Sequence, residues 1–237
     1  MLQEAIQVPS PASHRANAWR QRIKRAMTGV LPRGRFLVRG PSNTNAVCLT
    51  FDDGPHPENT PRLLDVLKRE GIPATFFLIG KNVEQHPEIV KRIVREGHAI
   101  GHHTYSHSHP ASQSASQLVG EIRRTDKLFR EICGKPFTLF RPPWGKLGAA
   151  KFIRVWAAGQ GVVLWTSDPR DCERKSADEV RGFFKANPLV GGDILLMHDD
   201  QPFAAEVLSE VIADARQRGL RFVTPLGWMG RCTAARQ

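Results

Sequence analysis

The chain has 237 residues, of which 41% are hydrophobic and 24% are charged, and its formal net charge is +11. This composition is typical of a globular protein and excludes a disordered chain. No apolar run reaches the ~18 residues that a membrane span requires, and the four widely spaced cysteines do not indicate a disulfide framework.

The first 40 residues form a basic segment. They hold eight Lys or Arg residues against one acidic residue, Glu4, and so carry +7 of the net charge. Such a segment can attract nucleic acid, anionic lipid or an acidic polymer, although its aromatic residues are too few for a base-stacking platform. We expect a solvated arm over residues 1–40, able to contact an anionic membrane weakly, and one domain over residues 41–237.

The N-terminus lacks the apolar core of a signal peptide. Together with the cysteine pattern, this predicts a reduced cytoplasmic protein that can also lie at the periphery of the inner membrane. A nucleic-acid partner is not favoured, and the sequence is silent on the oligomeric state.

From residue 46 onward, short apolar runs alternate with helices whose ends are readable. Thr60 is the expected N-cap of the first helix and Gly71 its end, and Ser176 with Glu179 predicts a capping box farther along. Seven strands alternating with helices predict an α/β protein with a parallel sheet, either open or closed into a barrel. The predicted strands are 46–51, 74–80, 98–103, one that begins near 138, 161–166, 193–199 and 220–224.

Polar residues cluster at the carboxyl ends of these strands. In α/β folds this is the edge where ligands bind. Any one of these residues could be structural, but their shared position favours a functional site. The residues are Asp52, Asp53, His102, His103, His107, Arg141, Asp168, Asp171, His198 and Asp199.

The pattern of histidines and aspartates indicates a metal site. His103 and His107 are four residues apart, and two histidines with one carboxylate make a common catalytic metal site with open positions. Asp52 and Asp53 would repel each other unless one binds the cation and the other, stabilised by an arginine, serves as a base. Both can reach one site only if the chain turns at once, and Gly54-Pro55 supplies that turn.

Five short motifs occur in order along the chain. They are "TFDDGP" (50–55), "HTYSH" (103–107), "RPPWG" (141–145), "WTSDPRD" (165–171) and "LLMHD" (195–199). On these motifs, the chain over residues 45–226 resembles the polysaccharide deacetylases, the NodB-homology domain of carbohydrate esterase family four. The motif "SDPRD" and the absence of a signal peptide favour the chitooligosaccharide deacetylases within this family.

The resemblance implies a fold, an activity and a metal. The fold would be a distorted (β/α) barrel with about seven parallel strands in a single domain. The activity would be that of a hydrolase of non-peptide carbon–nitrogen bonds, removing N-acetyl groups from GlcNAc-containing glycans. Asp53, His103 and His107 would bind a divalent metal, usually zinc, although such a set also accepts cobalt or nickel.

The resemblance also assigns catalytic roles to four residues. Asp52 would be the general base, held in place by Arg141. His198 would be the general acid that protonates the leaving amine. Asp168 would orient and charge His198. These roles agree with the needs of amide hydrolysis, which requires an activated water and a proton for the amine.

Three further residues would contact the substrate. The backbone N–H of Trp144 would stabilise the oxyanion, and Trp165 and Leu196 would line the pocket for the acetyl methyl group. The chain departs from the family pattern after Asp171, where tryptophan is common but Cys172 stands here. This departure puts the usual wall of the substrate groove in doubt.

Three alternatives to a glycan deacetylase remain open at this point. The chain could hydrolyse another amide or ester on the same fold. It could be a non-catalytic module that binds carbohydrate or membrane, although every base, acid and ligand position is filled. A nucleic-acid binder is the third alternative, and it depends on charge alone.

Overall fold

A computed structural model describes residues 35–229 of the chain. Most of the predicted basic arm, residues 1–34, and the last eight residues, 230–237, lie outside the described residues. Among the described helices, none is long and apolar enough to cross a membrane.

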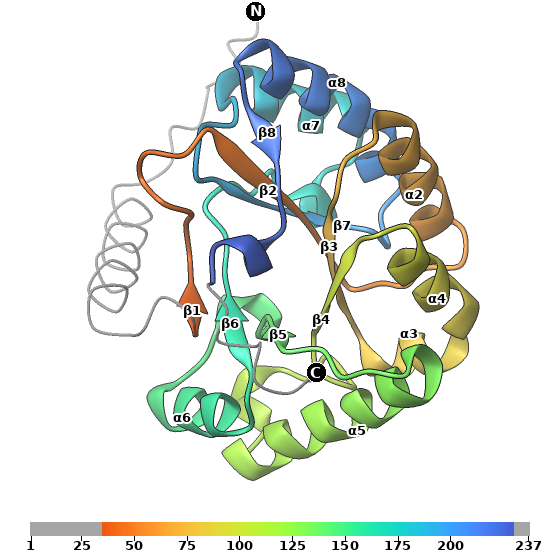
Figure 1. Cartoon of the computed structure of the whole chain (residues 1–237), viewed down its shortest axis with the longest axis vertical. Helices are drawn as coiled ribbons and strands as arrows, with labels where there is room; N and C mark the ends of the chain where they lie inside the picture. The colour runs from red at the N-terminus through yellow and green to blue at the C-terminus, as the bar shows by residue number, and fades with distance from the viewer. Residues whose placement is uncertain (1–34, 230–237) are drawn as a thin grey trace, which may run out of the picture. The chain divides into compact units, whose positions relative to one another are not determined.

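The strands of the described chain form one parallel sheet of eight strands (Figure 1). Their order is β1-β6-β5-β4-β3-β2-β7, and β8 pairs with β2. The strands are β1 (Phe36–Leu37), β2 (Ala46–Asp52), β3 (Thr75–Leu78), β4 (Ala99–His102), β5 (Leu139–Phe140), β6 (Gly161–Val163), β7 (Ile194–His198) and β8 (Arg221–Phe222).

The sheet closes on itself beyond β6. The chain that follows β6 runs to β7, where Ser167 forms an isolated parallel bridge with Leu195 and Thr166 N donates to Ile194 O at 3.0 Å. Strands β6, β5, β4, β3, β2 and β7 therefore form a ring. This confirms the predicted distorted barrel, whose bridge at Ser167 is weaker than a full strand ladder.

The strand β1 was not predicted from the sequence. Phe36 and Leu37 are buried and pair with Val162 and Val163 of β6, although they fall inside the predicted arm of residues 1–40. A two-residue strand within a basic segment has too short an apolar run for its periodicity to be read. The folded unit thus includes the end of that segment.

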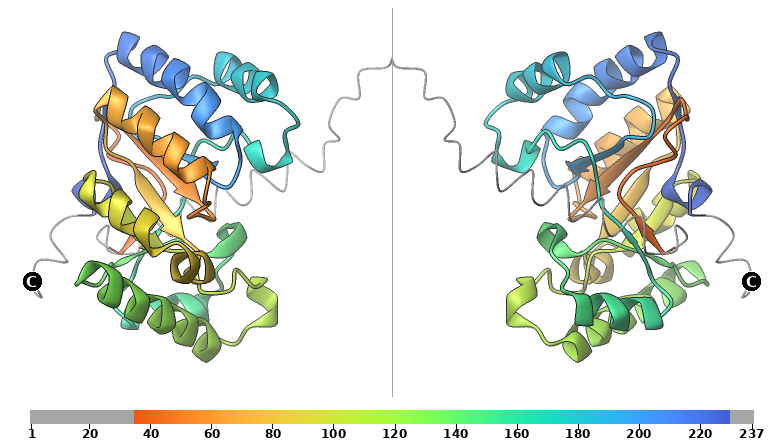
Figure 2. Two further views of the ribbon diagram at one scale, coloured as in Figure 1. Left: turned by 90° about the vertical axis from the view of Figure 1, so that its right-hand side faces the viewer. Right: turned by 90° about the vertical axis from the view of Figure 1, so that its left-hand side faces the viewer.

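Helices cover the outside of the sheet (Figures 1 and 2). Each strand from β2 onward is followed by at least one helix or a short 3₁₀ turn, as is usual between parallel strands, whereas β1 runs to β2 without one. The helices are α2 (Asn59–Glu70), α3 (Gly80–Gln85), α4 (Pro87–Arg95), α5 (Ala115–Cys133), α6 (Ala149–Ala157), α7 (Ala177–Ala186) and α8 (Phe203–Gln217), and the 3₁₀ turns are η1 (Pro110–Ser112), η2 (Pro143–Gly145), η3 (Asp171–Glu173) and η4 (Pro225–Gly227).

The helix ends agree with the sequence signals in part. Gly71 ends α2 in the left-handed conformation, with φ of 63°, as predicted. The prediction of Thr60 as its N-cap is wrong, because Glu58 occupies that position. The predicted capping box at α7 is half formed: Ser176 accepts the N–H of Glu179, but the Glu179 carboxylate turns to another backbone N–H.

Alternation along β2 separates two apolar cores. Val47, Leu49 and Phe51 face outward into the main core between the sheet and the helices. Cys48 faces inward and packs with Phe77 and other residues inside the barrel. Both faces of the sheet are therefore dry, which explains why the strands read as continuous apolar runs.

The inward-facing residues change character along the barrel. Above Cys48 on the same face of β2 come Thr50 and Asp52, which are both buried, and Arg141 follows β5 at the same end. The barrel interior is thus apolar below and charged at the carboxyl edge. This polar layer forms the base of the candidate site.

Truncating Phe76 should destabilise the fold strongly. Its buried ring contacts Phe51 and His98, at centroid distances of 5.3 Å and 5.7 Å. We expect Phe76→Ala to lower the free energy of unfolding in urea by about 3–5 kcal/mol, because it leaves a cavity. The control Ile153→Ala, at a side chain 59% exposed on α6, should change it by less than about 0.5 kcal/mol. Equal effects of the two substitutions would contradict this account of the core.

Candidate active site

Asp52 is bound to a buried arginine. Arg141 Nη1 donates to Asp52 Oδ1 at 2.7 Å, and the Arg141 side chain is fully buried. Burial raises the pKa of Asp52, and the charge and hydrogen bond of Arg141 oppose that rise. Because Oδ1 is engaged by Arg141, Oδ2 is the oxygen that faces the site, where it lies 3.8 Å from His103 Nε2.

Asp53 reaches the same site because the backbone turns at that residue. Its φ is 78°, in the left-handed region that asparagine and aspartate tolerate better than most residues. Asn82 Nδ2 donates to the Asp53 carbonyl at 2.7 Å and holds the turn. A side chain at the next residue, Gly54, would collide with the Asp199 carboxylate. The immediate turn that the sequence predicted after Asp52 is therefore present.

Asp53, His103 and His107 form a cluster suited to a metal ion. Asp53 Oδ1 lies 3.4 Å from His103 Nε2 and 3.3 Å from His107 Nε2. One ligand atom from each residue lies within 4.8 Å of the other two. Asp53 Oδ1 is buried and has no hydrogen-bond partner, which is unusual for a carboxylate oxygen and fits an atom meant for a cation.

The environment of His103 also fits a metal ligand. Its Nδ1 lies 2.8 Å from the backbone carbonyl of Arg141, so that Nδ1 carries the proton and Nε2 keeps its lone pair. Burial lowers the pKa of His103 to about 3, which keeps the imidazole neutral. The donor set of two imidazoles and one carboxylate suits zinc and other borderline divalent metals. The three residues predicted as ligands thus fit such a metal.

His198 is held by Asp171 and not by Asp168. Its Nδ1 lies 2.7 Å from Asp171 Oδ1, and its backbone N–H donates to Asp171 Oδ2 at 2.8 Å. Burial lowers the pKa of His198, but the hydrogen bond and charge of Asp171 outweigh burial and raise it to about 10. The expectation that Asp168 orients and charges His198 is therefore corrected to Asp171.

Asp168 instead shapes the loop after β6. Its Oδ1 accepts the backbone N–H of Arg170 at 2.8 Å, and its Oδ2 accepts Trp165 Nε1–H at 3.2 Å. Burial raises its pKa. The sequence offers Asp168 and Asp171 three residues apart in an irregular loop, where no periodicity tells which one faces inward. In the structure, the 3₁₀ turn η3 begins at Asp171 and places this residue, not Asp168, against His198.

Of the three residues expected to contact substrate, Trp144 lies against the cluster, and Trp165 and Leu196 lie beside other residues of the site. Trp144 is 49% exposed, with its ring centroid 4.5 Å from that of His107. Trp165 is partly buried beside Gly145, whose lack of a side chain leaves room for the Trp165 ring. Leu196 is buried on β7, on the same strand face as His198.

Thr60 and Asp199 support the site through a contact that the sequence did not predict. Thr60 Oγ1 donates to Asp199 Oδ2 at 2.6 Å, and Asp199 N donates to the Asp52 carbonyl at 3.2 Å. Burial raises the pKa of Asp199 to about 7. The buried threonine at the start of α2 was a signal for this contact, but it was taken for a helix cap.

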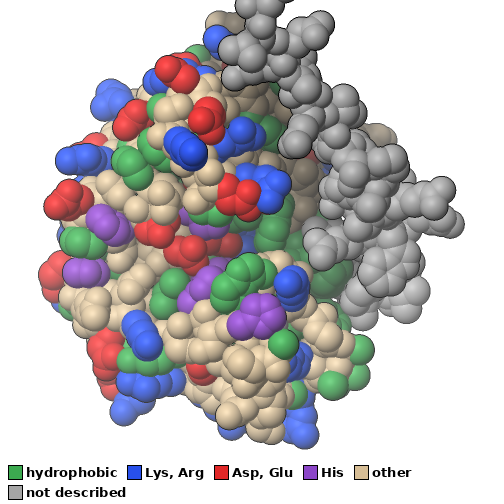
Figure 3. Space-filling view, turned by 180° about the vertical axis from the view of Figure 1, so that it is seen from behind, with side chains coloured by type: hydrophobic (Ala, Val, Ile, Leu, Met, Phe, Trp, Pro, Cys, Tyr) green, Lys and Arg blue, Asp and Glu red, His purple; other side chains and the backbone are tan. Residues whose placement is uncertain are grey.

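These side chains come together on one face of the described domain. Figure 3 shows histidine and acidic side chains gathered at the middle of that face, beside hydrophobic ones. His198 Nε2 lies 4.0 Å from Asp53 Oδ2. A candidate base, a candidate acid and a candidate metal site therefore share one small region, an arrangement suited to hydrolysis of a polarised carbonyl.

Comparison with known proteins supports a family assignment. Residues 39–158 match the family model described as polysaccharide deacetylase. A peptidoglycan-N-acetylglucosamine deacetylase of Bacillus cereus is 36% identical over 198 residues, which cover 81% of this chain and 92% of that relative. A chitooligosaccharide deacetylase of a Bradyrhizobium species is 34% identical over 187 residues, covering 78% and 85% of the two chains.

Solved structures agree with the sequence relatives. The crystal structure of a peptidoglycan N-acetylglucosamine deacetylase superposes with a TM-score of 0.78 at 34% identity, covering 82% of this chain and 92% of that chain. A CE4 family pseudoenzyme from Bacillus anthracis gives 0.76 at 25% identity, covering 82% and 68%. Since a family model and relatives matched over nearly their whole length agree, the chain belongs to the polysaccharide deacetylase family.

Proposed function

We propose that this chain is a metal-dependent hydrolase that removes N-acetyl groups from GlcNAc-containing glycans. One observation carries the proposal: Asp52, Asp53, His103, His107 and His198 converge at the carboxyl edge of the barrel. The reaction breaks a carbon–nitrogen bond that is not a peptide bond and yields acetate and a free amine. The relatives support the substrate class, since they are described as deacetylases of peptidoglycan GlcNAc and of chitooligosaccharides.

Fold likeness by itself does not make the chain an enzyme. A structural neighbour with a TM-score of 0.76 is described as a pseudoenzyme, so activity must be argued from the residues of this site. Here the carboxylates, histidines and arginine are all present and in mutual contact. A non-catalytic module has no need of a buried carboxylate oxygen without a partner, such as Asp53 Oδ1.

Asp53, His103 and His107 are the residues that would hold the metal. A divalent metal bound there supplies Lewis-acid chemistry, since it polarises an amide carbonyl and lowers the pKa of water. The donor set favours zinc, and cobalt or nickel would also be accepted.

Asp52 is the proposed general base. Arg141 fixes Oδ1 and leaves Oδ2 free to take a proton from the attacking water. Burial raises the pKa of Asp52 and so increases its basicity, while the charge and hydrogen bond of Arg141 oppose that rise and favour the anion. The carboxylate therefore combines a fixed orientation with increased basicity.

His198 is the proposed general acid. Asp171 holds Nδ1, so that Nε2 is the atom that delivers a proton to the departing amine nitrogen. With a pKa of about 10, the imidazolium is populated at neutral pH. The proton removed from water at Asp52 and the one delivered by His198 balance the cleavage.

We assign substrate contacts to three residues around this pair. The Trp144 backbone N–H would donate to the developing oxyanion, in keeping with its left-handed φ of 54° beside the metal ligands. Trp165 and Leu196 would enclose the acetyl methyl group. Their partly and fully buried side chains beside the charged cluster support that role.

We also propose that the basic arm brings the enzyme to an anionic membrane surface in the cytoplasm. Residues 1–40 carry +7, and cytoplasmic leaflets attract polybasic segments. The described cysteines, Cys48, Cys133 and Cys172, are free, as is usual in a reducing compartment. Trp156 and Ile153, exposed on α6, add apolar surface to the domain.

Acetate release from GlcNAc oligomers tests the reaction. We expect zinc-loaded protein to release acetate and Asp52→Asn to reduce the rate by roughly 100- to 10,000-fold, because it removes the base. Treatment with a chelator should abolish release, and added zinc should restore it. The control Asp178→Asn, at an exposed carboxylate on α7, should leave the rate unchanged. Folded, metal-loaded protein that releases no acetate from any acetylated glycan would contradict the proposal and favour another amide or ester substrate.

The pH dependence tests the acid and its partner. His198 acts when protonated, so activity should fall as the pH rises through its pKa of about 10. Asp171→Asn removes the hydrogen bond and the charge that raise this pKa most, and it leaves burial opposed only by the charges of Asp52 and Asp53, so the alkaline limb of the kcat profile should move to lower pH. Asp168→Asn should move that limb much less, because its hydrogen bonds go to Trp165 and Arg170. If Asp168→Asn moved the alkaline limb farther than Asp171→Asn does, Asp168 and not Asp171 would be the residue that charges His198.

Vesicle sedimentation tests the membrane contact. Neutralising Arg22 and Arg25 to glutamine should weaken binding to phosphatidylglycerol vesicles roughly tenfold or more, at about 1 kcal/mol per basic residue. The control replaces Lys68 and Lys127, exposed on α2 and α5, and should have a smaller effect. Binding that is insensitive to the arm substitutions, or equal on neutral vesicles, would refute a role for the arm.

A further inference from the structure

The loop between the two histidine ligands has an unfavourable backbone. Thr104 has φ of 67° and His107 has φ of 53°, both in the left-handed region. Such conformations are costly for residues other than glycine and persist only where the surroundings impose them. The position of His107 therefore depends on what holds this loop.

The carboxylate of Glu121, on α5, accepts two backbone N–H groups of the loop, whereas Glu84 and Arg124 contact the Tyr105 side chain. Glu121 Oε2 accepts the backbone N–H groups of Tyr105 at 3.2 Å and Ser106 at 3.3 Å. Glu121 Oε1 accepts the Ser106 hydroxyl at 2.5 Å and the Gln113 amide at 2.7 Å. Two oxygens thus receive four donors, two of them from the backbone between the ligands.

Other contacts restrain the loop without replacing this carboxylate. The Gly80 and Lys81 N–H groups donate to the Thr104 and Tyr105 carbonyls at 2.9 Å and 3.0 Å. The N–H of His107 donates to Thr104 Oγ1 at 3.0 Å. These bonds satisfy the carbonyls and the last N–H, whereas the N–H groups of residues 105 and 106 depend on Glu121.

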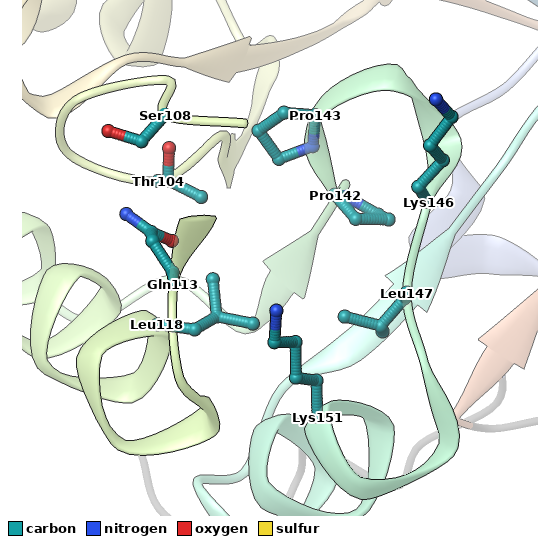
Figure 4. Close-up of a pocket in the computed structure, with 9 residues that line it drawn as sticks. All are labelled: Thr104, Ser108, Gln113, Leu118, Pro142, Pro143, Lys146, Leu147 and Lys151. Carbon is teal, nitrogen blue, oxygen red and sulfur yellow. The ribbon is translucent and has the colours of Figure 1, made fainter. Parts of the chain in front are cut away.

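Packing and hydrogen bonds both restrain the loop. Thr104 and Tyr105 are buried, and a side chain at Gly80 would collide with Tyr105. On one side, Thr104 and Ser108 line a small pocket between the loop, α5 and the turn at residues 142–147 (Figure 4). Packing does not supply acceptors for backbone N–H groups, and Glu121 supplies them for residues 105 and 106.

We propose that Glu121 is a positioning residue that holds His107 in its metal-binding position and so sets the affinity of the site for its metal. The proposal rests on the metal site of the proposed function. Glutamate suits the task because a carboxylate is an acceptor at both oxygens. Each oxygen of Glu121 accepts two donors. In a glutamine one of these oxygens is replaced by an NH₂ group, which is itself a donor, so two of the four hydrogen bonds would be lost.

Zinc affinity of the full-length protein tests the proposal. Metal-stripped protein is titrated with zinc chloride by calorimetry, in competition with a chelator. We expect Glu121→Gln to weaken zinc binding 10- to 100-fold, the range seen when partners of metal ligands are removed. The control Glu131→Gln, on the same helix and paired only with exposed Lys127 at 3.7 Å, should bind like the unmodified protein.

Two further readouts separate positioning from a general loss of stability. The visible absorption spectrum of the cobalt-loaded protein reports ligand geometry, and we expect it to change in Glu121→Gln but not in Glu131→Gln. Thermal unfolding of the metal-free proteins reports stability alone. If Glu121→Gln does not fold, Glu121→Asp keeps the acceptor chemistry on a shorter side chain and should show an intermediate affinity.

The outcomes separate this inference from the proposed function. Zinc binding and a cobalt spectrum unchanged in the Glu121 variants would overturn the positioning role and leave the metal site intact. Unmodified protein that binds no zinc would overturn the metal site itself, and the inference with it. Weaker binding with an altered cobalt spectrum in a folded Glu121 variant would establish the role.

Discussion

The buried ion pair between Arg141 and Asp52 is the constraint around which the site is organised. A guanidinium without solvent contact must have its donors satisfied inside the protein, or its burial would be strongly destabilising. Arg141 donates to Thr50, Asp52 and the carbonyls of Val163 and Leu164. These contacts join β2 to the chain at β5 and β6 across the inside of the barrel.

The same ion pair lies at the boundary between the apolar barrel interior and the polar residues of the candidate active site. Below it the barrel interior is apolar and dry, with Cys48, Phe77 and Ile194 among its buried residues. Above it lie the carboxylates and imidazoles of the candidate active site, among them Asp53, whose Oδ1 has no hydrogen-bond partner. The Arg141 guanidinium also stacks 4.2 Å from the centre of the Phe77 ring, so that the change from apolar to charged occurs within one layer of side chains. A charged site can therefore lie directly on an apolar barrel interior, because Arg141 covers that interior with its donors satisfied.

The sequence predicted what depends on periodicity and on motifs, and failed where loop geometry decides. The strands around Leu49, Phe76 and Leu195 follow from continuous apolar runs, and all were found. The histidine pair of the candidate metal site was predicted from the spacing of His103 and His107, and the family resemblance added Asp53. The partner of His198 was not predicted correctly, because the course of the chain between residues 167 and 176 depends on tertiary contacts.

Short elements and buried polar residues were the other difficulty. Strand β1 has two residues and no periodicity to read. Thr60 looks like a helix cap because threonine prefers that position, yet its hydroxyl is used by Asp199. Glu121 looks like an ordinary helix-surface glutamate. In each case a contact between segments distant in sequence decides the role, and local preference carries no information about it.

Arg141 contacts the site through both its side chain and its backbone. Its side chain binds the Asp52 carboxylate, and its backbone carbonyl accepts the Nδ1–H of His103 at 2.8 Å. Because both bonds end on one residue, the separation of the carboxylate and the imidazole is set at the end of β5 as well as by the strands β2, which holds Asp52, and β4, which ends just before His103.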